Sequence, residues 1–380
     1  MKILYIINKM EDLAGIERIL SCKMNYLSET TDHSVYLTTY EQRDCPLSYP
    51  LNSKIKYFAI DSPVSRRGNL SFIKWSKSYI ASRLLFRKQF KALLNKIHPD
   101  IVISTVYSYE IIDIIIKFSY KINAKTIFES HIKGDTVSIA KYQCNHLLIK
   151  LTSIWDHHLL NSLKDCDCIV SLTKDDASYW KQYAAHTEII PNMITISPKE
   201  VKDYSRKRVI AVGRYSHQKG FDLLLEAWHK ISEQYRDWQL YIFGNGERRE
   251  YQRTVDNYAM NSNVHLLPAT EDIAEEYSKS SIYVMSSRFE GFPLVLGEAM
   301  SCGLPCVSFD CPYGPKEIIS NGEDGIIVEN GNISAMALAL EKLMANVELR
   351  QMMGRKAAKN IVRYSPQHIM AQWNNLFKTL

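Results

Sequence analysis

Residues 282–309, IYVMSSRFEGFPLVLGEAMSCGLPCVSF, decide the fold class of this chain. The apolar run Ile282–Met285 is followed by a polar loop, a helix-length segment and a second apolar run, Cys306–Phe309. Pro293 suits the first helical position, and Gly303 suits the residue after the last turn. Continuously apolar strands with a helix between them indicate a parallel sheet covered on both faces, because parallel strands need a crossover connection.

Strand-length apolar runs recur along the 380 residues, with helix-length amphipathic stretches between them. The pattern restarts near residue 208, after the polar stretch Thr195–Lys207, which predicts a linker. We therefore expect an α/β protein with two Rossmann-like, doubly wound domains, at residues 1–195 and 206–364. The expected strands are Lys2–Ile7, Ser34–Thr39, Ile55–Ile60, Ile101–Thr105, Lys125–Glu129, Cys168–Leu172, Thr187–Ile190, Arg208–Val212, Gln239–Phe243, Val264–Leu267, Ile282–Met285, Cys306–Phe309 and Gly325–Val328.

Basic residues are concentrated in residues 62–99, which hold no acidic residue, although the whole chain has a formal net charge of only +6. Apolar residues at three- and four-residue spacing, from Phe86 to Ile97, predict an amphipathic helix in this segment. Such a helix suits an anionic membrane surface or a lipid diphosphate, and it equally suits a solvated helix that covers the first sheet. Nucleic acid is disfavoured because no recognisable reader module accompanies the helix. The candidate membrane or acceptor residues are Arg66, Arg67, Lys74, Arg83, Arg87 and Lys88.

The eight cysteines form no CxxC pair, and several lie in apolar runs. This usage predicts reduced, packed thiols in a cytoplasmic protein. Charged residues interrupt every apolar run before the length of about 18 residues that a membrane span needs. The triplet Asp165-Cys166-Asp167 has metal-ligand spacing but directly precedes an apolar strand, so we expect no metal site.

Two candidate anion-binding loops follow predicted strands of the second domain. Gly291-Phe292-Pro293 precedes a helix whose free N–H groups can hold a diphosphate. Glu290 and Glu298 flank these residues and can accept hydrogen bonds from ligand hydroxyls, although two surface glutamates beside a helix would have the same spacing. Gly213-Arg214 and Lys219-Gly220 follow the strand Arg208–Val212, where Arg supplies a bidentate fork and Lys a point charge.

A third glycine turn, Gly244-Asn245-Gly246, suits the close approach of a nucleotide. It is not the Gly-x-Gly-x-x-Gly dinucleotide fingerprint, because position 249 is Arg, and this disfavours a nicotinamide-dependent oxidoreductase. No Gly-x4-Gly-Lys-Ser/Thr sequence occurs either, which weighs against a P-loop nucleotide hydrolase.

These motifs resemble those of family-4 retaining glycosyltransferases of the GT-B fold. The resemblance is carried in the second half by residues 213–220, the Glu-x7-Glu element at 290–298 and the Gly-Leu-Pro-x-Val run at 303–307. The segments 310–317 and 321–325 are similar to the subset of that family that builds bacterial surface polysaccharides. In the first half, the matching elements are Ala14–Arg18, with Ala14 in place of the first Gly, Glu129-Ser130-His131, and Pro191-Asn192.

The resemblance implies a role for each matched residue. Arg214 and Lys219 would neutralise the donor diphosphate, Glu298 would bind the ribose, and Glu290 the donor sugar. Gly15 would let the first-domain loop approach the diphosphate, and His131 would contact the donor sugar across a cleft between the domains. The full expected donor set is Gly15, Gly213, Arg214, Lys219, Gly244, Asn245, Glu290, Gly291, Phe292, Pro293, Leu294 and Glu298, and the expected catalytic residues are His131, Arg214, Lys219 and Glu290.

The implied activity is transfer of a hexose or N-acetylhexosamine from a nucleotide sugar, UDP-linked, to a lipid-linked glycan, with retained anomeric configuration. The resemblance makes the first domain the acceptor domain, with a C-terminal helix at about 365–380 packed on it, and the second the donor domain. No cofactor or metal ion is expected, and the protein is expected on the inner face of the cell membrane. The alternatives are a sugar-nucleotide 2-epimerase of the same architecture and a non-catalytic glycan-binding partner.

Overall fold

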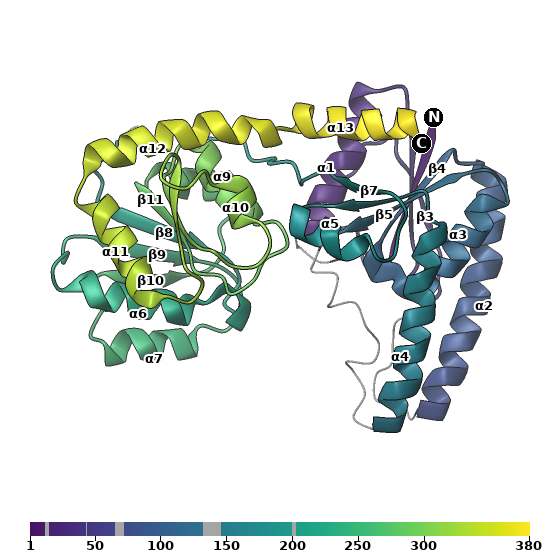
Figure 1. Cartoon of the computed structure of the whole chain (residues 1–380), viewed down its shortest axis with the longest axis horizontal. Coiled ribbons are helices and arrows are strands. Elements are labelled where there is room, and N and C mark those ends of the chain that lie inside the picture. The colour runs from purple at the N-terminus through teal and green to yellow at the C-terminus, as the bar shows by residue number, and fades with distance from the viewer. Residues whose placement is uncertain (12–14, 43, 65–71, 132–145, 200–202) are drawn as a thin grey trace. The chain divides into compact units, whose positions relative to one another are not determined.

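The computed structural model describes residues 1–11, 15–42, 44–64, 72–131, 146–199 and 203–380 (Figure 1). The chain forms two compact units, one made of Met1–Pro191 and Ile369–Leu380 and the other of Asn192–His368. Each unit is built on one sheet whose neighbouring strands are all parallel. The prediction of two parallel α/β domains is therefore confirmed.

The first unit contains a seven-stranded sheet in the order β3-β2-β1-β4-β5-β6-β7. In Figure 1, α2, α3 and α4 lie along one side of this sheet, and α1 and α13 lie on the other. The strands are β1 (Lys2–Ile7), β2 (Ser34–Thr39), β3 (Lys56–Ala59), β4 (Ile101–Thr105), β5 (Lys125–Ser130), β6 (Cys168–Ser171) and β7 (Thr187–Ile189). The helices are α1 (Gly15–Thr30), α2 (Phe72–Ile97), α3 (Ile112–Tyr120), α4 (His146–Asn161), α5 (Lys174–Trp180) and α13 (Pro366–Thr379), with short 3-10 turns at Val106–Ile111 and Ser162–Asp165.

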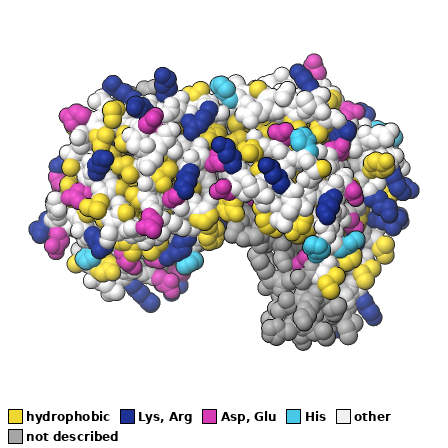
Figure 2. Space-filling model, viewed as in Figure 1, with side chains coloured by type: hydrophobic (Ala, Val, Ile, Leu, Met, Phe, Trp, Pro, Cys, Tyr) yellow, Lys and Arg dark blue, Asp and Glu magenta, His cyan; other side chains and the backbone are white. Residues whose placement is uncertain are grey.

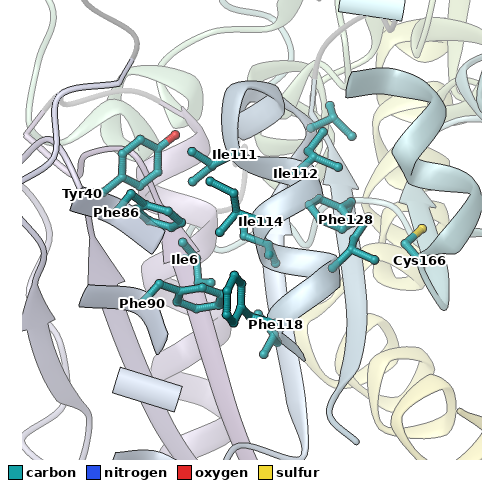
Figure 3. Packing of buried hydrophobic residues seen from close by; sticks show 14 of the residues in the cluster. Ile6, Tyr40, Phe86, Phe90, Ile111, Ile112, Ile114, Phe118, Phe128 and Cys166 are labelled. Carbon is teal, nitrogen blue, oxygen red and sulfur yellow. The ribbon is translucent and has the colours of Figure 1, made fainter. Parts of the chain in front are cut away.

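The long helix α2 packs its aromatic side chains on the sheet of the first unit. Phe86 and Phe90 are fully buried and stacked on each other, with ring centroids 5.4 Å apart. Figure 3 shows them beside Ile6 of β1 and Phe118 of α3. The apolar spacing that predicted an amphipathic helix therefore marks the buried face of α2, and the helix covers the sheet.

The second unit contains a six-stranded sheet in the order β10-β9-β8-β11-β12-β13. In Figure 1, α6, α7 and α11 lie on one face of it, and α9, α10 and α12 on the other. The strands are β8 (Arg208–Val212), β9 (Gln239–Phe243), β10 (Val264–Leu267), β11 (Ile282–Met285), β12 (Cys306–Phe309) and β13 (Gly325–Val328), all with the predicted bounds. The helices are α6 (Phe221–Ser232), α7 (Arg249–Asn257), α8 (Ile273–Ser278), α9 (Leu294–Ser301), α10 (Pro315–Ile318), α11 (Ile333–Met344) and α12 (Val347–Asn360), with 3-10 turns at His217–Lys219 and Ile361–Tyr364.

The strand order of the second sheet reverses between its adjacent strands β8 and β11. Ligands of open α/β sheets bind beyond the carboxyl ends of the strands at such a switch point. The loop after β8 contains residues 213–220, and the loop after β11 contains residues 286–293. The topology thus brings the two predicted anion-binding loops to the same edge of the sheet.

One detail of the second loop differs from the prediction. Pro293 is the residue before the helix, not the first helical residue, because its ψ of 87° lies outside the helical region and α9 begins at Leu294. Its carbonyl accepts the hydrogen bonds of the Leu296 and Gly297 N–H groups and so starts the helix. Gly303 follows the last turn with a φ of +87°, as predicted.

Candidate functional site

Lys219 and Glu290 form an ion pair at the switch point of the second unit. The Lys219 Nζ atom lies 2.7 Å from Glu290 Oε1, and the Ser287 hydroxyl donates to the same oxygen at 2.5 Å. The Glu290 side chain is only 7% exposed and that of Lys219 is 18% exposed. A Cβ atom on Gly213 would lie 3.0 Å from Lys219 Cδ, so a glycine there leaves room for the lysine stem. The structure therefore brings together three residues that the sequence analysis assigned to one site.

The backbone around Lys219 is fixed by Gly220 and Ser286. Gly220 has a φ of +62°, and a Cβ atom there would lie 2.1 Å from the Ser286 carbonyl oxygen. Only glycine allows this combination of left-handed backbone and close approach. The Ser286 hydroxyl also donates to the Lys219 carbonyl at 2.9 Å. The loops after β8 and β11 are thus in direct contact.

The turn after β9 packs closely against the loop after β8. A Cβ atom on Gly244 would lie only 1.7 Å from the Gly213 carbonyl oxygen, so a side chain cannot fit there. The Asn245 carbonyl accepts the Tyr215 N–H at 2.7 Å. Gly244 and Asn245 therefore shape the same edge as Gly213, and their contribution is through the backbone.

Arg214 lies at this edge with an exposed side chain. Within the described part of the chain, no hydrogen bond or ion pair engages its guanidinium group. Its five donors are therefore available to a ligand, and the predicted contact with phosphate oxygens stays a prediction.

Glu298 lies in α9 and is buried, and Phe292, just before that helix, packs on Tyr364 with ring centroids 5.4 Å apart. Sequence reasoning missed Tyr283, a fully buried tyrosine in β11 whose hydroxyl has no hydrogen-bond partner within the described residues. Burial raises the pKa of Tyr283 well above its ordinary value, and electrostatic interactions with Cys306, Glu290 and Glu298 raise this pKa further. A tyrosine in an otherwise aliphatic strand was the signal in the sequence.

His131 of the first unit belongs to a buried charge network at the end of β5. Its Nε2 atom lies 3.3 Å from Glu129 Oε2, which also accepts a 2.5 Å hydrogen bond from Lys23 of α1. The Lys23 ammonium group lies 3.7 Å from the centroid of the Trp373 ring. The sequence analysis did not place Lys23 in a site. The signal for it is a lysine between Leu20 and Met24 on the apolar face of α1.

Electrostatics keep the Glu129 carboxylate ionised in this buried network. Burial would raise the pKa of Glu129, but the charge of Lys23 and the neighbouring His131 outweigh burial and lower it to about 2. The pKa of Lys23 is lowered by burial, an effect that Glu129 partly offsets. The network can therefore hold the His131 imidazole beside a permanent negative charge. Gly15, the remaining candidate of the first unit, begins α1 and is exposed.

The cations of the basic segment differ in exposure and in ion pairing. Lys74, Arg87 and Lys88 of α2 are exposed, whereas Arg66 and Arg67 lie outside the described residues. Arg83 differs from the expectation of a free basic surface: its Nη2 atom lies 2.6 Å from Asp113 Oδ2, and its side chain is 13% exposed. Its charge is neutralised because α3 brings Asp113, from outside the acid-free segment, against α2.

Large apolar side chains are exposed beside these cations. Ile80 and Leu84 of α2 are each 58% exposed, and Ile154 of α4 is 69% exposed. A pocket of about 240 Å³ lies here and is lined by residues of α2, α3 and α4, including Arg87, Lys117 and Trp155. Figure 2 shows hydrophobic and basic side chains interspersed over this edge of the first unit. No described helix has the length and apolar character needed to cross a bilayer.

Known proteins with similar sequences identify the protein family of this chain. Residues 192–360 match the family described as glycosyl transferases group 1. An uncharacterized glycosyltransferase of Haemophilus influenzae is 32% identical over 241 residues, covering 59% of this chain and 68% of the relative. The amylovoran biosynthesis glycosyltransferase AmsD of Erwinia amylovora is 26% identical over 99% of both chains. The lipopolysaccharide 1,6-galactosyltransferase of Escherichia coli is 27% identical, covering 81% of this chain and 83% of the relative.

Solved structures agree on the fold. TarM superposes with a TM-score of 0.75 at 16% identity, over 99% of this chain and 98% of that one. Anabaena HepE in complex with UDP superposes with a TM-score of 0.72 at 14% identity, over the full length of both chains. Two parallel α/β domains of this kind define a GT-B glycosyltransferase fold. The chain belongs to the glycosyl transferases group 1 family, and the epimerase alternative finds no support among these matches.

Proposed function

We propose that this protein is a retaining glycosyltransferase of bacterial surface polysaccharide biosynthesis. It transfers a hexose or N-acetylhexosamine from a UDP-linked donor to a lipid-linked glycan. The observation that carries this proposal is the Lys219–Glu290 pair at the switch point of the second sheet, beside an exposed Arg214. The names of AmsD and of the lipopolysaccharide galactosyltransferase support the pathway class, and the UDP complex of HepE supports the nucleotide.

The donor is held by charges and hydroxyl acceptors that the second unit already presents. Arg214 and Lys219 bind the diphosphate, whose negative charge grows as it leaves, and so they stabilise the transition state more than the ground state. Glu290 accepts hydrogen bonds from the donor sugar and Glu298 from the ribose. The bond from the anomeric carbon to the diphosphate breaks while the acceptor oxygen bonds to the same face. The acceptor proton passes to a diphosphate oxygen, so the step needs no metal ion.

The first unit supplies the acceptor side and a membrane surface. We assign membrane contact to the exposed face of α2, because it combines the cations Lys74, Arg87 and Lys88 with the exposed apolar Ile80 and Leu84. Apolar side chains enter the headgroup region while Lys and Arg attract anionic lipids. The protein is therefore a cytoplasmic, peripheral enzyme of the inner face of the membrane, where a lipid-linked acceptor is presented.

A ligand panel followed by product analysis tests the proposed function. Thermal shift with UDP-, GDP- and ADP-sugars identifies the donor, and we expect a UDP-sugar to raise the melting temperature most. Transfer to a lipid-diphosphate glycan with that donor, followed by NMR of the new linkage, reports the anomeric configuration. An inverted product would contradict retention, and tight glycan binding with no transfer from any donor would favour a non-catalytic glycan-binding partner.

A further inference from the structure

Arg288 and Asp222 form a two-pronged ion pair beside the proposed donor site. Arg288 Nη1 donates to Asp222 Oδ1 at 2.8 Å and Nη2 donates to Oδ2 at 2.5 Å. Nη1 also donates to the His217 carbonyl at 2.8 Å. The guanidinium group therefore bonds to both ends of the segment that contains Lys219. Two parallel hydrogen bonds between planar groups fix orientation as well as distance.

Backbone and amide contacts strengthen the same connection. The Arg288 N–H donates to the Gln218 carbonyl at 2.8 Å, and the Gln218 side chain donates to the Phe289 carbonyl at 3.1 Å. These bonds lie one residue before Lys219 and one or two residues before Glu290. The position of each partner in the Lys219–Glu290 pair is therefore set by neighbours that Arg288 holds together.

We propose that Arg288 is a positioning residue that, through Asp222, holds Lys219 and Glu290 in the geometry that receives the donor diphosphate. Arg288 does not itself bind the donor, because Asp222 and His217 already occupy its fork. The inference rests on the proposed function, since it assumes that Lys219 binds a diphosphate.

Electrostatics agree with a permanent ion pair. The hydrogen bond from Arg288 lowers the pKa of Asp222 against the opposing effect of partial burial. The same hydrogen bond raises the pKa of Arg288. Lysine cannot replace the arginine, because a single ammonium group cannot reach both carboxylate oxygens and the carbonyl in one plane.

The affinity ratio between UDP and UMP separates positioning from general stabilisation. Lys219 is expected to contact the β-phosphate, so the wild-type protein binds UDP more tightly than UMP. Arg288→Lys should reduce this preference about tenfold, the order of one charge-assisted hydrogen bond. UMP affinity should stay unchanged, whereas a merely loosened unit would lose affinity for both nucleotides equally.

Calorimetric titration of UDP and UMP against Arg288→Lys, Asp222→Asn and the double variant tests the proposal. Matched controls are Arg249→Lys and Asp237→Asn, which alter the exposed ion pairs with Glu247 and Lys207. Because the two residues act as one unit, the double variant should be no weaker than either single variant. An intact UDP preference in both single variants overturns the positioning role. A wild-type protein that binds no nucleoside diphosphate overturns the proposed function instead.

Discussion

The Lys219 ammonium group lies 2.7 Å from Glu290 Oε1, although the two residues are 71 positions apart in the chain. Each side chain was assigned a different part of the donor, yet in the structure each is the other's partner. Under the proposed function, a donor diphosphate entering this site would compete with Glu290 for the lysine. The Glu290 carboxylate would then be released toward the hydroxyl groups of the sugar, so the two halves of the donor would be recognised together.

Replacing Lys219 by methionine should lower kcat about 10²- to 10³-fold, the loss typical of one donor to a developing negative charge. The substitution also leaves Glu290 without its cation, so the melting temperature must be measured alongside the rate. Lys199→Met is the matched control, because Lys199 pairs with Asp272 at 2.6 Å on the surface. Equal rates for the two variants would contradict the role of Lys219.

Glu298 is buried and is proposed to accept the ribose hydroxyls, so its replacement by alanine should weaken donor-nucleotide binding by about tenfold or more. The variant should also stop distinguishing UDP from its 2′,3′-dideoxy analogue. Titration calorimetry with both ligands measures this. An unchanged dissociation constant for UDP would refute the assignment of Glu298.

The first unit should lose the stabilising contribution of the Lys23–Glu129 pair in acid. The pKa of Glu129 is about 2 in the folded protein against an ordinary value of 4.5. Its contribution is therefore present in full above about pH 4.5 and is lost as the pH falls toward 2. Glu129→Gln leaves Lys23 buried without its counter-charge and should cost about 3–5 kcal/mol near pH 7.

Unfolding followed from pH 7 to pH 2 in both proteins measures this effect. The difference in unfolding free energy between wild type and Glu129→Gln should shrink across the window between pH 4.5 and 2. A constant difference would mean that the carboxylate does not carry the interaction.

In the proposed mechanism Arg214 and Lys219 supply the positive charge at the diphosphate, so turnover should not need a divalent cation. Product formation after extensive dialysis against EDTA should equal that of untreated enzyme. Loss of activity that only added Mg²⁺ or Mn²⁺ restores would show that a metal ion takes part.

Charge reversal on α2 should release the protein from anionic vesicles. Each basic side chain near an anionic surface contributes about 1 kcal/mol, so Arg87→Glu with Lys88→Glu should lower partitioning more than about tenfold. The matched control reverses Arg355 and Lys356, an adjacent exposed pair on α12 of the second unit. Flotation with phosphatidylglycerol vesicles at low salt measures partitioning. Negligible binding of the wild-type protein would contradict the assignment of membrane contact to α2.

The sequence predicted the strands of the second sheet better than those of the first. All six strands of the second sheet have the predicted bounds, because each is a short apolar run between polar or glycine-containing segments. In the first sheet β3, β6 and β7 are shorter than predicted, and β5 is one residue longer. The apolar residues Ile60, Leu172 and Ile190 follow the last residues of β3, β6 and β7, so hydrophobicity alone does not mark where strand pairing stops.

Ion pairing in the candidate site was less predictable. The switch-point rule predicts that the loops after β8 and β11 lie together, but it does not determine which cation pairs with which carboxylate. Lys23–Glu129, Arg83–Asp113 and Arg288–Asp222 each join elements distant in sequence, and one chain offers no pattern that selects such partners. Only the tertiary structure brings these partners together.

The placement of α13 has a consequence for the order in which the protein matures. The second unit has all its residues once His368 has been synthesised, whereas the first unit still lacks Ile369–Leu380. Trp373, which covers the Lys23 ammonium group, is among these late residues. On the ribosome the second unit can therefore close first, although domains generally complete folding in the order of their synthesis. The buried charges of the first unit must wait until residues 369–380 have been synthesised to receive their aromatic cover.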